Sequence, residues 1–170
     1  LLLYFIYIHF PGKLFRLITF LFNEFNKYTN FKGEVCLKNE SEIPPSDDVQ
    51  LLFGTPTSIV YWIKSARLDV SNVKFLVIDE VDTILDKNGT FFSSTNFLLK
   101  EYLPKDTQYG FFASTIKVSI IDFIKKIRPN IFTIHIKRCE QCCVNIEHWY
   151  TKVENIEQGK IAIVYLIKSL

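Results

Sequence analysis

The chain has 170 residues and a mass of 19.9 kDa, a length that fits one globular domain or one domain with a small part of a second. Hydrophobic residues make up 48% and charged residues 22%, which excludes intrinsic disorder as the main state. Twenty basic and eighteen acidic residues give a net charge of +2, so any basic surface for nucleic acid would be a local patch. Four irregularly spaced cysteines favour a reducing, intracellular compartment over a secreted disulfide scaffold.

The first ten residues, LLLYFIYIHF, form a continuous apolar run that ends at Pro11-Gly12. A bilayer-spanning helix needs about 20 apolar residues. A secretory signal needs a basic segment before the run and small residues after it, and neither is found here. The run therefore predicts a strand buried on both faces, and we expect no membrane partner. Because methionine is missing, at position 1 and elsewhere, we expect the sequence to be a fragment.

Short apolar runs and helical spacings alternate along the rest of the chain. Strands are predicted at 32–37, 49–54, 73–78, 108–113 and 132–136, and helices at 14–28, 59–66, 92–102 and 118–127. Such alternation is typical of an α/β fold with a parallel sheet. The pattern weakens at residues 139–147, a predicted linker, and a strand at 148–153 and a helix at 160–170 are predicted beyond it.

The third of these apolar strands ends in acidic residues. FLVIDEVD places Asp79 and Glu80 at the carboxyl end of a predicted strand, with Asp82 two residues later. Ligands of parallel α/β sheets bind at that end. An apolar strand followed by two carboxylates is the Walker B arrangement, in which the first acid holds Mg²⁺ through water and the second polarises an attacking water. A solvated acidic turn is the alternative, and this short string leaves both open.

The longer string VIDEVDTILDKNG resembles motif II of the DEAD-box RNA helicases, in which DEAD is followed by x-x-L-D and a glycine. The segment Asp79-Glu80-Val81-Asp82 stands for DEAD, and Leu85, Asp86 and Gly89 take the following positions. This motif carries most of the specificity of the resemblance.

Other pieces follow in the family's order over about residues 11–165. Phe53-Gly54-Thr55-Pro56 resembles motif Ib, Phe112-Ala113-Ser114-Thr115 resembles motif III, and Pro11-Gly12-Lys13 faintly resembles motif Ia. The segment LPKDTQ and the tail IEHWYTKVENIEQGK resemble the branch of the family that works in mRNA export at the nuclear pore.

The resemblance implies a RecA-like parallel sheet flanked by helices and incomplete at its N-terminus. Residues 1–138 would form most of a first RecA-like domain, and residues 148–170 the start of a second one after the linker. The resemblance further implies binding of ATP, Mg²⁺ and RNA in the nucleus or cytoplasm, with nuclear-pore or mRNA-export proteins as partners.

The resemblance also implies roles for single residues. Asp79 would hold Mg²⁺ through water, the catalytic Glu80 would orient the hydrolytic water, and Asp82 would bond to Ser114 and Thr115, which would link the nucleotide state to domain closure. The RNA backbone would be contacted by two segments, Gly54-Thr55-Pro56-Thr57 and Pro11-Gly12-Lys13.

The sequence departs from the family in ways that bear on activity. No G-x-x-x-x-G-K-[ST] loop occurs among the 170 residues, and the adenine-reading Q motif is missing as well. Motif Ib has Thr57 where the family has glycine, and motif III reads Ala-Ser-Thr. These residues alone should therefore not hydrolyse ATP. The alternative to a piece of an active helicase is a decayed, non-catalytic RNA-binding or adaptor module with the same fold.

Three further signals receive the simpler interpretation. Cys139, Cys142 and Cys143 form only half of a zinc pattern, so we expect free thiols in a linker. Trp62 and Trp149 are expected to pack in a core, not to stack on bases. The aromatic-rich helix at 14–28 is likewise expected to be a core helix, not a partner groove.

Overall fold

The computed structural model describes residues 5–8, 13–36, 45–46, 48–136, 145–147 and 149–169. The chain divides into two compact units, Leu1–Ile131 and Phe132–Leu170, which are described separately.

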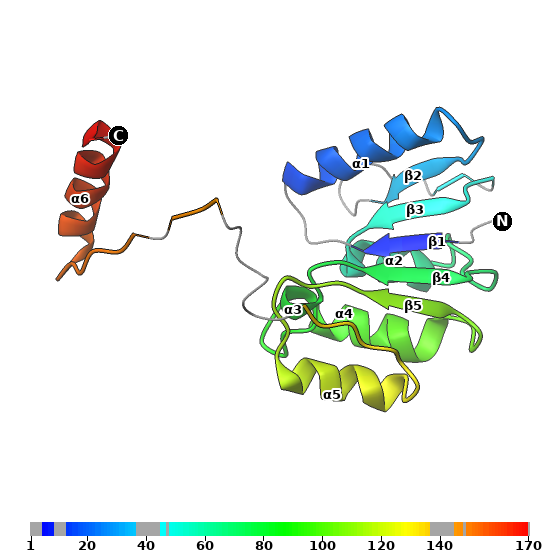
Figure 1. The fold of residues 1–170 in the computed structure, drawn as a ribbon. Coiled ribbons are helices and arrows are strands. Elements are labelled where there is room, and N and C mark those ends of the chain that lie inside the picture. The colour runs from blue at the N-terminus through cyan, green and yellow to red at the C-terminus, as the bar shows by residue number, and fades with distance from the viewer. Residues whose placement is uncertain are drawn as a thin grey trace. The chain divides into compact units, whose positions relative to one another are not determined.

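The first unit is built on a five-stranded parallel sheet in the order β2-β3-β1-β4-β5 (Figure 1). Its strands are β1 (Phe5–Ile8), β2 (Gly33–Cys36), β3 (Leu51–Gly54), β4 (Phe75–Ile78) and β5 (Gln108–Phe111). The parallel α/β fold expected from the sequence is confirmed.

Helices connect these strands. They are α1 (Lys13–Asn26), α2 (Pro56–Lys64), α3 (Val81–Ile84), α4 (Phe92–Phe97), the π-helix η1 (Leu98–Tyr102) and α5 (Val118–Ile127). A Cβ on Gly54 would lie 3.1 Å from Ile59 of α2, so α2 covers the face to which the side chains of Ile8 and Ile78 point. A Cβ on Gly33 would lie 2.5 Å from Phe22, so α1 covers the opposite face.

The core lies between the sheet and the helices that cover it on the same face as α2. Two rows of fully buried side chains run across the sheet, which are Leu52, Ile6 and Leu76 in one and Ile8 and Ile78 in the other. Buried side chains from helices and loops extend this core, among them Ile59, Val73, Ile84 and Leu98. Branched aliphatic side chains fill a buried parallel sheet in this manner.

The opposite face, called here the open face, is covered less completely. Phe22 of α1 packs on Phe53 of β3 with ring centroids 5.3 Å apart. Over the neighbouring strands, Phe75 is 44% exposed, and Tyr7 and Val77 are half-buried.

The helix predicted at 14–28 exists, but its assignment to the core is wrong. Most of the apolar side chains that the structure describes on this helix face solvent, which are Leu17, Phe20, Leu21 and Phe25 at 44–73% exposure. Helical spacing reports an apolar stripe, and it does not report whether the chain supplies a surface to cover that stripe.

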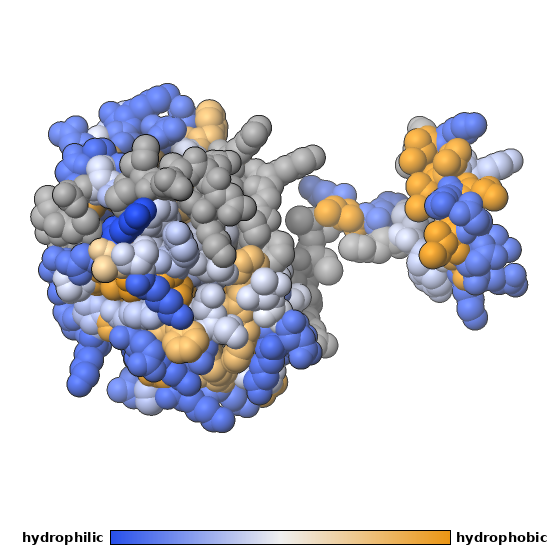
Figure 2. Space-filling model, turned by 180° about the vertical axis from the view of Figure 1, so that it is seen from behind, coloured by the Kyte–Doolittle hydropathy of each residue, from blue (hydrophilic) through white to orange (hydrophobic). Residues whose placement is uncertain are grey.

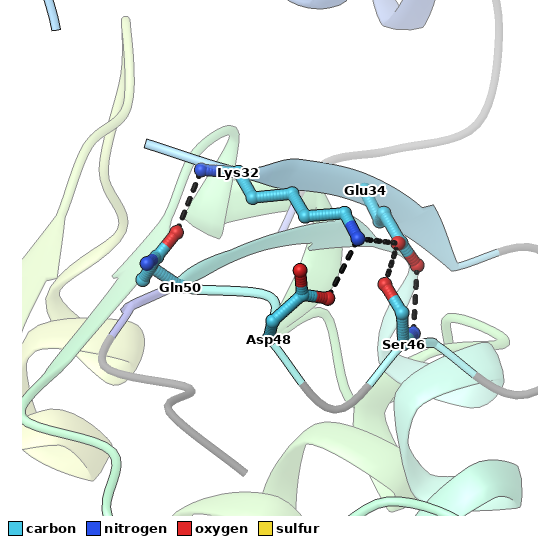
Figure 3. A network of polar contacts seen from close by, with 5 residues as sticks. All are labelled: Lys32, Glu34, Ser46, Asp48 and Gln50. Carbon is cyan, nitrogen blue, oxygen red and sulfur yellow. Dashed lines mark hydrogen bonds and ion pairs between the residues drawn. The ribbon is translucent and has the colours of Figure 1, made fainter. Parts of the chain in front are cut away.

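A polar network joins β2 to the segment before β3 (Figure 3). The Lys32 ammonium lies 2.6 Å from Asp48, and its backbone N–H donates to Gln50. Ser46 donates to the Glu34 carboxylate through both its backbone N–H and its hydroxyl. The network holds Ser46 and Asp48 beside β2. Because its charged groups are largely exposed, it contributes little stability.

In the second unit, α6 (Ile156–Ser169) is the regular element. The helix starts four residues before the predicted start at residue 160, and its apolar side chains are exposed along its length (Figure 2).

The predicted strand at 132–136 is wrong, because these residues join no strand and Phe132 and Ile134 are more than 80% exposed. The described part of 148–153 is not a strand either. Trp149 is 81% exposed, against the expected core position, whereas Trp62 is buried as expected.

Cys139, Cys142 and Cys143 lie outside the described residues. Elsewhere in the described chain, no three His, Cys, Asp or Glu residues are grouped to hold a metal ion. No helix among the described residues has the length and apolarity to cross a membrane.

Two neighbouring residues of β4 test the difference between the faces. We expect Leu76→Ala, which empties a fully buried position, to lower the free energy of unfolding by about 2–5 kcal/mol. Phe75→Ala on the open face should cost only about 1 kcal/mol, because that ring is already in water over much of its surface. Urea unfolding of both variants measures this, and equal losses would contradict the assignment of the faces.

Cys36 makes stability depend on pH. Burial raises the pKa of its thiol from 9.0 to about 12, so the unfolded chain loses this proton first. The contribution is complete below pH 9 and is lost as pH rises toward 12. Between about pH 8 and about pH 10 the wild type should lose roughly 1 kcal/mol more than Cys36→Ala. Denaturant unfolding at the two pH values measures this, and parallel losses would contradict it.

Candidate nucleotide and RNA site

The acidic turn, residues 79–82, is tied to a strand on either side. The Asp79 N–H donates to the Ile8 carbonyl of β1 at 3.0 Å. The Val81 N–H donates to the Phe112 carbonyl after β5 at 2.9 Å. These bonds continue the sheet ladders beyond β4, so the turn is held as firmly as the strands that carry it.

Both oxygens of the Asp79 carboxylate accept hydrogen bonds. The Glu80 N–H donates to Oδ1 at 2.9 Å, and the Tyr7 hydroxyl donates to Oδ2 at 2.8 Å. Burial, the hydrogen bond to Asp79 and the nearby carboxylate charges raise the pKa of Tyr7 well above its ordinary value, so the phenol stays protonated. Sequence reasoning missed Tyr7. Its place three positions before the end of the apolar run was a signal only once β1 and β4 were known to be neighbours.

Glu80 has a left-handed backbone, with φ 48° and ψ 43°, directly before α3. A residue with a Cβ pays roughly 1–2 kcal/mol for this conformation. Glu80 is half-exposed at the carboxyl edge of the sheet.

Asp82 lies on the first turn of α3, and the Thr115 hydroxyl donates to its Oδ2 at 3.1 Å. The structure thus brings together one of the two expected pairs, while Ser114 is exposed on the same loop. A pocket of about 570 Å³ adjoins this bond, with Asp86 and Lys117 among its lining residues.

The segment resembling motif Ib forms the start of α2. Thr55 is the N-cap, and its hydroxyl accepts from the Ser58 N–H at 3.2 Å. Thr55 and Pro56 are buried, and Thr57 is half-buried. Gly54 suits a close approach of β3 to β2, because a Cβ there would lie 3.0 Å from the Cys36 carbonyl oxygen, closer than most real Cβ contacts. The Thr55 hydroxyl is engaged in capping, so a phosphate at this helix start would meet backbone N–H groups and Thr57.

The motif Ia segment is only partly described. Lys13 begins α1, and its side chain is outside the described residues, as are Pro11 and Gly12. The described strands run parallel, so β1, β3, β4 and β5 all end on the same side of the sheet. The acidic turn and the start of α2 lie on that carboxyl side, where ligands of parallel sheets bind.

A family profile described as DEAD/DEAH box helicase matches residues 14–123. The chain belongs to this family, and the membership expected from motif II is confirmed.

Individual relatives agree with the mRNA-export branch expected from the sequence. The chain is 27% identical to the ATP-dependent RNA helicase dbp5 of Schizosaccharomyces pombe, over 91% of this chain and 30% of the relative. It is 30% identical to DBP5 of Candida glabrata, over 69% of this chain and 23% of the relative. The chain thus spans about a third or less of these curated relatives.

Solved structures of Dbp5 share the fold. Saccharomyces cerevisiae Dbp5 bound to RNA and ADP BeF3, as an amino-acid variant, aligns with a TM-score of 0.71 at 24% identity, over 79% of this chain and 34% of that one. A Dbp5 variant bound to Nup159, Gle1, IP6 and ADP aligns with a TM-score of 0.65 at 26% identity, over 75% and 34%.

The strain at Glu80 gives a stability test. Glu80→Gly should raise the free energy of unfolding by up to about 1 kcal/mol, because glycine adopts this backbone without a Cβ penalty. Glu80→Gln keeps the Cβ and should not. Ala66, which has φ 57° at the end of α2, supplies a matched control in Ala66→Gly. Thermal unfolding measures all three, and a destabilised Glu80→Gly with a stabilised Ala66→Gly would contradict the strain.

Proposed function

We propose that this chain is part of an ATP-dependent RNA helicase, in which it carries the Walker B half of the ATPase site and one RNA-backbone surface. The observation that carries the proposal is the acidic turn, where Asp79 is oriented by two hydrogen bonds and Asp82 is bonded to Thr115. A solvated acidic turn would need neither arrangement.

The chemistry of the turn fits a magnesium nucleotide. The acidic turn offers the Asp79 and Glu80 carboxylates, and carboxylate oxygens are ligands that suit Mg²⁺ whose other ligands are water and phosphate oxygens. Bound Mg²⁺ would neutralise charge on the phosphates of ATP. In this proposal Asp79 fixes the water shell of the ion, and Glu80 accepts a hydrogen bond from the attacking water.

The phosphate-binding half would come from a strand–loop–helix unit outside the described residues. β5 is at the edge of the sheet, paired with β4 on one side. If a further strand lay beside β5 and were connected to β1, the chain would cross the sheet from the β5 side toward the β2 side. The connection from β1 to β2 crosses the sheet in the same direction. Right-handed crossover then puts its helix on the face of α1. That is the open face, where Phe75 and Val77 are incompletely covered.

The start of such a helix would lie at the carboxyl edge of the sheet, beside Asp79. Helix N-termini bind phosphate through their unpaired N–H groups. One added strand–loop–helix unit would therefore pair with the edge strand β5, cover the open face and bring a phosphate-binding helix start beside the acidic turn.

RNA would bind along the same edge. The start of α2, with Thr57 and the backbone N–H groups of its first turn, suits a phosphate. Such contacts position RNA without reading its sequence. Pro11, Gly12 and Lys13 stay predictions for this surface. The hydrogen bond between Thr115 and Asp82 would link the nucleotide state to closure of the complete helicase.

The second candidate is a non-catalytic RNA-binding or adaptor module. It is favoured by two departures from the family motifs, which are Thr57 in place of glycine and the Ala-Ser-Thr order of motif III. In either case, we propose partners of the Gle1 and Nup159 kind, because a solved Dbp5 variant is bound to both, and a place in the nucleus or cytoplasm.

A chimera separates the two candidates. Residues 5–131 would replace the matching segment of the Schizosaccharomyces pombe relative, so that Tyr7 and the acidic turn come from this chain and the relative supplies the remaining parts. We expect RNA-stimulated phosphate release, and we expect Glu80→Gln in the same chimera to lower it by roughly a hundredfold or more, as loss of a catalytic base does.

The control is Glu101→Gln, an exposed carboxylate on η1, which should leave the rate unchanged. A folded chimera that binds RNA without releasing phosphate would support the adaptor. Turnover that Glu80→Gln does not alter would contradict the enzyme proposal at this site.

A further inference from the structure

Among the hydrogen bonds of the described residues, the acidic turn accepts one from an aromatic hydroxyl, that of Tyr7. Tyr7 lies on β1, in register with Val77 of β4, and its side chain reaches along the open face to Asp79. The position is otherwise apolar, between Phe53 and Val77 on the neighbouring strands. Phenylalanine would fill the same space, so the hydroxyl is an addition that packing does not require.

Aromatic packing holds the Tyr7 ring in place. Its centroid lies 5.9 Å from that of Phe53, which in turn lies 5.3 Å from that of Phe22 on α1. The ring is thus supported from the helix side, and the hydroxyl has a fixed point from which to donate. A held donor restricts rotation of the carboxylate that accepts from it.

Without Tyr7, Asp79 keeps a single anchor, the Glu80 N–H on Oδ1. With Tyr7, the carboxylate is pinned at both oxygens, and each oxygen keeps one lone-pair direction for another donor such as a metal-bound water. In this bond the Tyr7 hydroxyl is the donor and the Asp79 carboxylate is the acceptor.

We propose that Tyr7 is a positioning residue for Asp79, which orients the carboxylate toward the water shell of a divalent cation. This inference rests on the proposed function of Asp79 as the magnesium-holding acid. It adds to that site a residue outside motif II, which lies on β1, the strand paired with β4.

The test is Mn²⁺ binding by the full 170-residue chain, followed by electron paramagnetic resonance of the free ion. We expect Tyr7→Phe to weaken the binding that depends on Asp79 by roughly tenfold, the lower end of losses for second-layer hydrogen-bond partners. Tyr150→Phe, which alters a side chain that is 98% exposed, is the matched control and should bind as the wild type does.

A second readout excludes a merely structural effect. In the wild type labelled with ¹³C-tyrosine, Mn²⁺ should broaden one tyrosine ring signal first, and that signal should be the one missing from Tyr7→Phe. Asp79→Asn should abolish this selective broadening. Circular dichroism at each Mn²⁺ concentration establishes that every variant is folded.

The outcomes separate the two proposals. If Asp79→Asn loses Mn²⁺ and folded Tyr7→Phe binds as the wild type, the positioning role of Tyr7 is overturned and that of Asp79 stands. If the wild type and Asp79→Asn bind Mn²⁺ equally, the magnesium role of Asp79 is contradicted and that of Tyr7 with it.

Discussion

The candidate site depends on the parallel pairing of β4 with β1 and β5. This pairing continues past the last strand residue, through the bonds of Asp79 to Ile8 and of Val81 to Phe112. A loop held at both sides by backbone bonds keeps its side chains in fixed directions. The strained conformation of Glu80 can persist there, because the neighbouring strands determine the path of the chain.

The two faces of the sheet differ in how complete they are. One carries a dense aliphatic core under α2, and the other leaves Phe75 and most of the apolar side of α1 in water. Exposed apolar surface of this kind marks a place for another part of a protein. The same face carries Tyr7, so a unit docked there would lie directly beside the acidic turn and would exclude water from the bond between Tyr7 and Asp79.

Much of this arrangement could be predicted from the sequence. The short apolar runs located all five strands, and VIDEVD located the acidic turn, because both signals are local. The errors concern features that depend on distant neighbours. The alternation at 132–136 predicts a strand, yet a strand requires a hydrogen-bonded ladder, and Phe132 and Ile134 are exposed instead. Trp149 and α1 are similar cases, since apolar character alone does not establish burial. Tyr7 was missed because its partner lies 72 residues away.

The central claim is that the acidic turn is the Walker B half of an ATPase site. A crystal structure of the chimera with Mg²⁺, ADP·BeF₃ and RNA tests it most directly. The account predicts Asp79 within hydrogen-bond distance of water on Mg²⁺, still accepting from Tyr7, with Glu80 beside the water that faces the phosphate mimic. A magnesium ion held by other groups, with Asp79 turned away from its water shell, would contradict the account.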